Sequence, residues 1–296
     1  MLYRQGAHNG GICKMSSKII ELLKRGMEAN YADRFRKGNL IRLPSKGMLI
    51  ITGDLHGHRL NFQRIVAFAD LAHHPDTHVI LQEIIHGGPE DKNGGCLSYK
   101  LLFDVIHYKI WFPNRVHLIM GNHDTAYINN VKVMKNGKEM NVAMRSALDR
   151  EFEDNSEEVK LALKQFLFSQ ALAVKCANGV FVSHSLPGDR YGEKFDPKIL
   201  DKELKINDIV KPGSAYLLTW GRSHSQQLLN KMSKTLGAKI FVLGHQRQEK
   251  GCSRAGNNLI ILASDHDHGC ILPMDLDRSY TIEQLLDMVI PLAAIA

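Results

Sequence analysis

The chain has 296 residues, of which 44% are hydrophobic and 23% charged, and its formal net charge at pH 7 is +7. These values are ordinary for a folded globular protein of one domain and exclude an intrinsically disordered chain. No stretch reaches the ~18 apolar residues that a membrane span needs, and residues 1–17 lack the apolar segment of a secretory signal.

The five cysteines are widely spaced and lack paired metal-binding spacing, which suits a reducing compartment. We therefore expect a cytoplasmic protein. Its positive charge should draw anionic substrates by long-range steering. The basic residues are dispersed, as in 132–138 and 198–205, and acids lie between many of them, so a dedicated nucleic-acid groove is not indicated. The oligomeric state stays open.

In chain order, apolar residues recur at helical spacing in segments 17–36, 97–110, 157–171 and 225–236. This spacing predicts helices, the last of them ending at Gly237, a good helix stop. A further helix should follow Asp54 and carry Phe62 and Ile65, with its amino end near the site. Thr281 and Gln284 have the spacing of a capping box that opens a short final helix.

Short apolar runs alternate with the predicted helices: 48–52, a run from Thr77, 116–120, 179–182, 238–243 and 258–262. Runs of this kind, rich in Val, Ile and Leu and bounded by turn residues, are typical of strands buried on both faces. Strands that alternate with helices favour the α/β class.

The first strand leads directly into Asp54 and His56, in the string Gly-Asp-Leu-His-Gly. A carboxylate and an imidazole two positions apart, in a loop loosened by glycine, commonly bind a divalent metal. The alternative is a helix cap followed by a surface histidine.

Three later strands also end in residues of the metal-binding types, namely Asn122 with His123, His184, and His245. Ligands in such sheets collect at the carboxyl ends of the strands, because the loops converge there. We therefore expect these side chains to share one crevice. For His184 and His245, the alternative is a histidine whose ring is satisfied by the backbone at a strand end.

The order of the motifs, Gly-Asp-x-His-Gly, Gly-Asn-His-Asp, Ser-His and Gly-His, resembles that of the calcineurin-like metallophosphoesterases, in particular the phosphoprotein phosphatases and their bacterial relatives. The resemblance covers residues 47–276. It implies an α/β sandwich of mixed sheets flanked by helices, with metals at the carboxyl edge of the strands. We expect a single domain, with a helical extension at 1–46, a helical insert at 125–174 that shapes the substrate pocket, and a final helix within 277–296.

The resemblance also implies two divalent ions, of Mn, Fe or Zn. Asp54 and His56 would hold the first ion, and Asn122, His184 and His245 the second. Two such ions about 3.5–4 Å apart can clamp a phosphoryl group and turn a bridging water into hydroxide. His123 would be the general acid that protonates the leaving oxygen.

The second motif of that family is altered in this chain. Glu83 stands where the metal-bridging aspartate belongs, His86 replaces the aspartate that orients His123, and Gly87 replaces a phosphate-binding arginine. Glycine cannot supply a bidentate guanidinium, so Arg222 is the best candidate to compensate; its alternative is an exposed loop arginine. If the loop is merely weakened, restoring Asp at 83 and 86 and Arg at 87 should raise activity.

Residues 263–269 alternate acids and imidazoles after another apolar run. Asp265, His266 and His268 could supply a ligand or a hydrogen bond to one. A solvated hairpin turn is the favoured interpretation of this segment.

The sequence thus predicts a phosphomonoester hydrolase that acts on phosphoserine or phosphothreonine in proteins, or on a small phosphorylated compound. One alternative is a phosphodiesterase or a dinucleoside polyphosphate hydrolase. Another is a degenerate relative that binds metal or phosphate but turns over poorly, because Glu83, His86 and Gly87 depart from the pattern.

Overall fold

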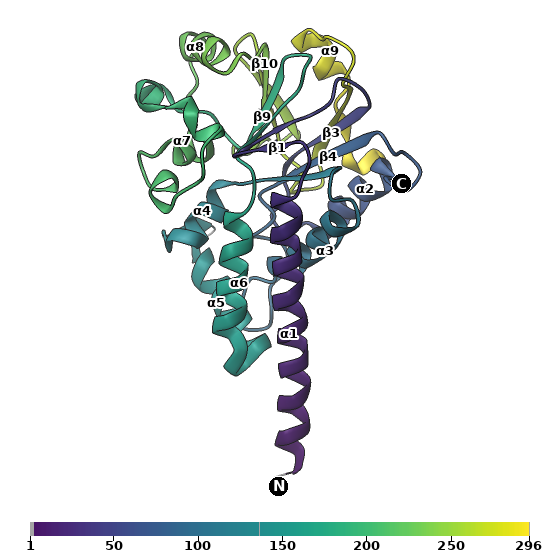
Figure 1. Ribbon diagram of the computed structural model, residues 1–296, viewed down its shortest axis with the longest axis vertical. Helices are drawn as coiled ribbons and strands as arrows, with labels where there is room; N and C mark the ends of the chain where they lie inside the picture. The colour runs from purple at the N-terminus through teal and green to yellow at the C-terminus, as the bar shows by residue number, and fades with distance from the viewer. Residues whose placement is uncertain (1–2, 136, 296) are drawn as a thin grey trace.

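Two β-sheets form the centre of the protein, and helices cover their outer faces (Figure 1). The computed structural model describes residues 3–135 and 137–295. Within this part, no helix combines the length and the apolar character that crossing a bilayer requires. The predicted α/β sandwich of mixed sheets is confirmed.

The five-stranded sheet has the order β14-β13-β3-β4-β5. Its strands are β3 (Met48–Asp54), β4 (Thr77–Gln82), β5 (Val116–Ile119), β13 (Cys270–Asp275) and β14 (Ile290–Pro291). β3, β4 and β5 run parallel, and β13 pairs antiparallel with β3. The carboxyl ends of β3, β4 and β5 therefore lie along one edge.

The seven-stranded sheet has the order β1-β2-β8-β9-β10-β12-β11. Its strands are β1 (Arg36–Lys37), β2 (Leu40–Arg42), β8 (Ala173–Lys175), β9 (Val180–Ser183), β10 (Ile240–Leu243), β11 (Cys252–Ala255) and β12 (Leu259–Leu262). β9, β10 and β12 are parallel neighbours.

One apolar core lies between the sheets and takes residues from both, such as Ile51, Ile80, Val182 and Val242. The opposite faces of the strands, as at Leu81, pack into a second core with the helices. Burial on both faces explains why the central strands are continuous apolar runs rather than alternating ones.

Helices cover both outer faces of the sandwich. α2 (Arg59–Ala69) and α3 (Ser98–Trp111) lie on the five-stranded sheet, whereas α7 (Ser214–Trp220) and α8 (Gln226–Leu236) lie on the side of the other sheet. α8 ends at Gly237, whose φ of +58° and N–H bond to the Ser233 carbonyl form the predicted stop. The predicted capping box of Thr281 and Gln284 opens α9 (Ile282–Asp287).

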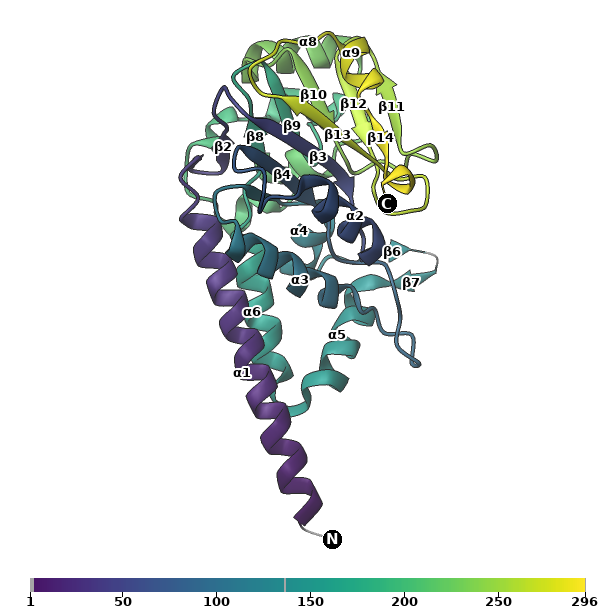
Figure 2. The same cartoon turned by 90° about the vertical axis from the view of Figure 1, so that its right-hand side faces the viewer.

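A group of helices extends below the sheets: α1 (Tyr3–Tyr31), α4 (Asn122–Asn129), α5 (Met140–Phe152) and α6 (Ser156–Phe168). α1 runs beside α6 and α3 (Figure 2). The Asn30 amide fixes this packing by donating to the Ser169 hydroxyl at 2.8 Å.

Three predicted helical segments contain other elements as well. The extension at 1–46 is not wholly helical, because β1 and β2 follow α1 and β2 pairs with β8. The insert at 125–174 contains a hairpin of β6 (Met134–Lys135) and β7 (Lys138–Glu139). Beyond residue 277, α9 has only six residues and is followed by β14 and a 3-10 turn (Leu292–Ala294).

Two further sequence-based predictions also differ from the structure. The first helix ends at Tyr31 rather than at residue 36, because Asp33 turns inward and accepts the Phe35 N–H at 3.0 Å. Residues 263–269 form no hairpin turn, since β12 and β13 belong to different sheets and the segment crosses between them.

Candidate metal centre

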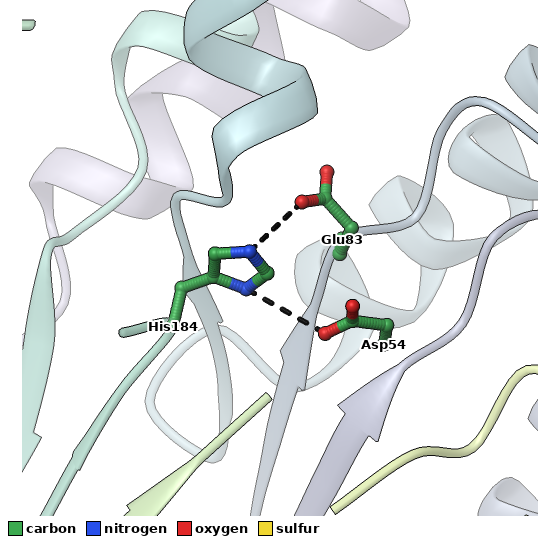
Figure 3. Close-up of side chains that lie close together, drawn as sticks. All are labelled: Asp54, Glu83 and His184. Atoms are coloured by element: carbon green, nitrogen blue, oxygen red, sulfur yellow. Dashed lines mark ion pairs between the residues drawn. The ribbon is translucent and has the colours of Figure 1, made fainter. Parts of the chain in front are cut away.

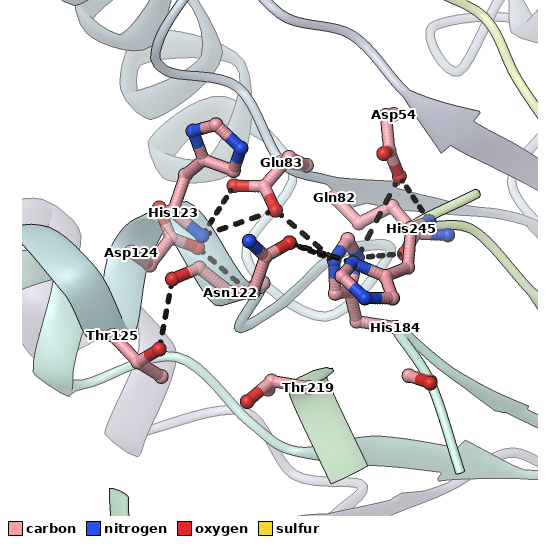
Figure 4. A network of polar contacts seen from close by, with 12 residues as sticks. Asp54, Gln82, Glu83, Asn122, His123, Asp124, Thr125, His184, Thr219 and His245 are labelled. Carbon is pink, nitrogen blue, oxygen red and sulfur yellow. Dashed lines mark hydrogen bonds and ion pairs between the residues drawn. The ribbon is translucent and has the colours of Figure 1, made fainter. Parts of the chain in front are cut away.

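The parallel strands of both sheets end at one place (Figure 4). A parallel bridge between Asp54 and Ala263 joins the end of β3 to the end of β12, and the Ser264 N–H donates to the Asp54 carbonyl at 3.0 Å. The loops after β3, β4, β5, β9 and β10 therefore converge. They bring together the predicted ligand set of Asp54, His56, Glu83, Asn122, His184 and His245.

Asp54, Glu83 and His184 form the centre of this group (Figure 3). One ligand atom from each lies within 4.8 Å of those from the other two. His184 Nε2 is 3.0 Å from Glu83 Oε2, and its Nδ1 is 3.6 Å from Asp54 Oδ1. The His184 ring thus stands between the two carboxylates.

A buried glutamine sets the orientation of His184. The Gln82 amide donates to the Thr52 carbonyl at 2.7 Å, which turns its Oε1 toward His184 Nδ1 at 2.9 Å. Nδ1 therefore carries the proton, and Nε2 presents a lone pair to Asn122 Oδ1 at 2.9 Å. A lone pair that faces amide and carboxylate oxygens fits a cation bound by all three groups.

The other two histidines face their expected partners. His56 Nδ1 donates to the Ile85 carbonyl at 2.9 Å, which leaves Nε2 free to face Asp54 Oδ2 at 3.7 Å. His245 Nδ1 lies 2.7 Å from Asn122 Oδ1. The His245 backbone N–H donates to Asp54 Oδ1 at 2.9 Å and so links the two halves of the site.

The two central carboxyl groups are buried close to each other. Burial raises the pKa of Asp54 to about 7, with the charge of His184 opposing this shift and that of Glu83 adding to it. Burial raises the pKa of Glu83 to about 8, although the hydrogen bond from the His123 N–H lowers this pKa. Such groups ionise readily only beside a cation. Together with imidazole nitrogens and an amide oxygen, they fit Mn, Fe or Zn.

The backbone at the site is held in an uncommon conformation. His56, Glu83, His86 and His245 have φ values of +42°, +47°, +65° and +67°. Each of these residues lies in a loop that directly follows a strand. Positive φ values cost conformational energy in residues other than glycine. Such residues cluster at functional sites, where the strained backbone holds the side chains in the orientation that the site needs.

Glu83 points into the protein and is fully buried. Both of its carboxylate oxygens accept the His123 N–H at the amino end of α4, at 3.2 Å each. Gly121 leaves room for this contact, since a Cβ there would lie 2.5 Å from Glu83 Oε2. The added methylene of Glu83, relative to aspartate, thus carries the carboxylate to a helix amino terminus, where N–H groups favour negative charge.

Residues 48–272 match the family model of the calcineurin-like phosphoesterases. The chain belongs to this family. It is therefore a metal-dependent enzyme that hydrolyses phosphate esters, and the resemblance drawn from the sequence is confirmed. No curated protein matches the chain.

Solved structures share the fold of this phosphoesterase. One is a protein serine/threonine phosphatase from Saccharomyces cerevisiae with similarity to human phosphatase PP5, at 13% identity and a TM-score of 0.65, with 87% of this chain and 82% of that one covered. Another is a cold-active protein-tyrosine phosphatase of the psychrophile Shewanella sp., at 14% identity and a TM-score of 0.56, with 82% and 79% covered.

His123 of this phosphoesterase lies beside the ligand group, with its Nδ1 2.8 Å from His86 Nδ1. Its ring meets that of His56 edge to face, at 4.9 Å between centroids. Burial lowers the pKa of His123 well below its ordinary value, and the charges of His56 and His86 add to this effect. Since the buried imidazole of His86 contacts its Nδ1, no carboxylate among residues 3–135 and 137–295 contacts the His123 ring to stabilise an imidazolium.

The loop around Gly87 has no room for a side chain. A Cβ there would lie 2.4 Å from the His56 carbonyl oxygen, and Gly57 and Gly88 pack backbone on backbone beside it. An arginine at position 87 would displace the loop that holds His56, so this steric conflict argues against a gain of activity from the triple change at 83, 86 and 87, which stays a prediction. Arg222 is exposed at the rim, and its Nη1 donates to the His245 carbonyl at 3.3 Å.

Sequence reasoning missed Gln82, the residue that orients His184. It also missed Thr125, whose hydroxyl accepts the Trp220 indole N–H at 2.9 Å and ties the segment before Arg222 to α4. Gln82 could have been found, because a glutamine that directly precedes a ligand within an otherwise apolar strand must have a buried partner.

Proposed function

We propose that this phosphoesterase hydrolyses phosphomonoesters, carried by a serine or threonine side chain of a protein or by a small compound. The observation that supports this most is the convergence of ligand atoms from both sheets around His184, with His123 beside them. Asp54 and His56 would hold one divalent ion and Asn122, His184 and His245 a second, with Glu83 between them. When bound, such ions would activate water and neutralise charge on the phosphoryl oxygens.

The residues of the chain have distinct tasks in this proposal. Gln82 and the Ile85 carbonyl hold the proton on Nδ1 of His184 and of His56, so that each Nε2 stays a lone pair. His123 is the general acid for the leaving oxygen, and the contact of its Nδ1 with His86 Nδ1 at 2.8 Å holds its ring in place. Arg222 stands over the carboxyl ends of the strands and binds phosphoryl oxygens.

An open groove of about 1010 Å³, lined by Asp265 and His266 among others, is large enough for a leaving group with more than one residue or ring. Cys96, Cys176, Cys252 and Cys270 are free thiols. They suit the reducing cytoplasm that we propose as its location.

Hydrolysis of para-nitrophenyl phosphate and of its bis-ester, with metal analysis of the purified protein, tests the proposal. We expect bound divalent metal, turnover of the monoester that rises with added Mn and stops with a chelator, and little turnover of the bis-ester. Asp54→Asn is the matched control, because it should lose metal and turnover together. Faster cleavage of the bis-ester would favour a phosphodiesterase, and bound metal without turnover would favour a degenerate relative.

A further inference from the structure

A cavity of about 280 Å³ lies among α4, α5 and α6, the helices that extend below the sheets (Figure 1). Its lining includes Tyr127 from α4, Arg145 from α5, and Lys160 and Lys164 from α6. The lining contains none of the proposed metal ligands, and neither His123 nor Arg222. Its volume is close to the lower end, ~300 Å³, of the range for small-molecule sites. The cavity is therefore a candidate site for a small ligand outside the metal centre.

Three basic side chains line this cavity, and they differ in their partners. The Lys160 ammonium contacts Glu157, the one acid of the lining, at 2.7 Å. Lys164 is half-buried one turn further along α6, and no hydrogen bond or ion pair with another described residue engages its ammonium. Arg145 is also half-buried, and no carboxylate in the described part of the chain is paired with it. Two positive charges of the wall thus lack a counter-charge.

Tyr127 adds a buried hydroxyl to the cavity. The residue is 1% exposed, and its Oη has no hydrogen-bond partner among the residues that the structure describes. Arg145 Cζ lies 4.9 Å from the centroid of the Tyr127 ring, and Arg145 Nη2 donates to the Tyr127 carbonyl at 3.1 Å. Burial raises the pKa of Tyr127 to about 12, although the charge of Arg145 lowers this pKa, so the hydroxyl keeps its proton. A buried donor without an acceptor is costly, and a ligand oxygen would remove this cost.

The three groups without acceptors indicate the chemistry of the ligand. A guanidinium matches the oxygens of a phosphate with a fork of N–H donors, and an ammonium adds a compact charge. The two unpaired cations balance the two charges of a phosphate dianion. Its oxygens are numerous enough to accept from donors on three different helices.

We propose that the cavity between α4, α5 and α6 binds a phosphate dianion, either free or carried by a small compound, with Arg145, Lys164 and Tyr127 as donors. The inference goes beyond the proposed function and does not depend on it. The cavity nevertheless adjoins the metal centre. Tyr127 lies one turn after His123 on α4, and its ring centroid is 6.4 Å from that of His86.

Calorimetry of the metal-loaded protein with inorganic phosphate tests the site. Lys164→Met should weaken binding to the cavity about ten- to a hundredfold, as for loss of a hydrogen bond to a charged group. Metal content and KM for para-nitrophenyl phosphate should stay unchanged, since Lys164 lies outside the metal centre. Lys164→Arg should retain most of the binding. Lys24→Met is the control, because it removes the same charge from an exposed position on α1, away from the lining.

Tyr127→Phe removes only the hydroxyl. Phosphate binding to the cavity should weaken about tenfold. The free energy of unfolding without phosphate should not fall, because the hydroxyl has no partner to lose. Loss of stability with unchanged phosphate binding would mean that the hydroxyl is structural and would remove it from the site.

Asp54→Asn separates the cavity from the metal centre, because this variant should lose the metal and the phosphate held there but keep the phosphate of the cavity. Glycerol 2-phosphate, added to the same variant, distinguishes the two sources of the ligand. Tighter binding than inorganic phosphate would identify a small phosphorylated compound, and weaker binding would identify free phosphate. Absence of phosphate binding in Asp54→Asn would overturn the assignment. So would phosphate binding in Asp54→Asn that is weakened equally, or not at all, by Lys164→Met and Lys24→Met.

Discussion

β4 and β5 carry buried polar residues at both of their ends, and the two groups behave differently. At the amino edge, His78 and His117 lie in the first residues of β4 and β5. At the carboxyl edge, the same strands deliver Glu83 and Asn122. The sheet between them is apolar, so each cluster must satisfy its own charges.

The amino-edge cluster is complete in itself. Asp33 Oδ2 accepts from Lys109 at 3.1 Å and from His117 Nδ1 at 2.8 Å, and His78 Nδ1 donates to His117 Nε2 at 3.0 Å. Burial would raise the pKa of Asp33, but the hydrogen bond and charge of His117 and the charge of Lys109 outweigh it and hold this pKa well below its usual range. One assignment of protons is consistent with all three of these hydrogen bonds.

The carboxyl-edge cluster is incomplete without a cation. The lone pairs of its nitrogen and oxygen atoms face one another around His184, the pKa values of Asp54 and Glu83 are raised, and His245 Nε2 is buried with no hydrogen-bond partner. Burial alone therefore does not distinguish a structural cluster from a functional one. The distinction lies in whether the protein supplies the counter-charge.

The largest expected effect is at the carboxyl edge. His123→Ala should lower turnover of an alkyl phosphomonoester by about 10²–10⁴-fold, because proton donation to the leaving oxygen is lost. The loss should be smaller for para-nitrophenyl phosphate, whose leaving group needs little protonation. Metal content should stay intact. An equal loss on both substrates, or loss of metal, would contradict the role of a general acid.

The matching change at the amino edge should affect stability instead. Lys109 and Asp33 are each about 1% exposed in their side chains, so Lys109→Met leaves a buried carboxylate without its cation. We expect the free energy of unfolding to fall by about 3–5 kcal/mol, measured in urea. Adding Asp33→Asn should recover part of it. Turnover per folded molecule should be unchanged, and a change in KM would mean that the two edges are coupled.

A smaller effect is expected from Gln82, which belongs to the site without facing substrate. Gln82→Leu frees the His184 ring and should weaken metal binding or activity about 10–100-fold. Thr52→Val is the matched control, since it removes another buried hydrogen bond of β3, from Oγ1 to the Ile80 carbonyl at 3.0 Å, without touching His184. Equal metal affinity in Gln82→Leu and the unaltered protein would exclude the orienting role.

The sequence predicted the carboxyl edge better than the amino edge for a physical reason. The carboxyl ends of neighbouring parallel strands converge. The predicted ligands Asp54, Asn122, His184 and His245 lie at such ends or within three residues after them. The partner of His117 is Asp33, far earlier in the chain and beyond a helix, so no local pattern reveals the pair. The same contacts of Asp33 with Lys109 and His117 accompany the end of α1 at Tyr31, before the predicted residue 36.

Elements with little periodicity were missed as well. The two-residue strands β6 and β7 are too short for an alternating pattern, so the insert was expected to be helical.

The smallest expected effect concerns acid. Burial lowers the pKa of His78 to about 3, with the charge of His117 adding to this. Since the folded pKa lies below the unfolded value of 6.5, His78 stabilises the fold at high pH and loses this contribution as the pH falls. Between pH 7 and pH 6 the loss in the free energy of unfolding should be about 0.7 kcal/mol.

His78→Asn tests this expectation. The variant keeps a donor near the position of Nδ1 but does not titrate, so its free energy of unfolding should fall less between pH 7 and pH 6. The metal-loaded protein is the one to compare, because the bound cation keeps Asp54 and Glu83 ionised. It thereby removes their opposite dependence, a loss of stability as the pH rises from their unfolded pKa values of 3.8 and 4.5 to about 7 and 8. Identical pH slopes for the two proteins would mean that His78 is not held neutral and that the amino edge is less complete than its hydrogen bonds indicate.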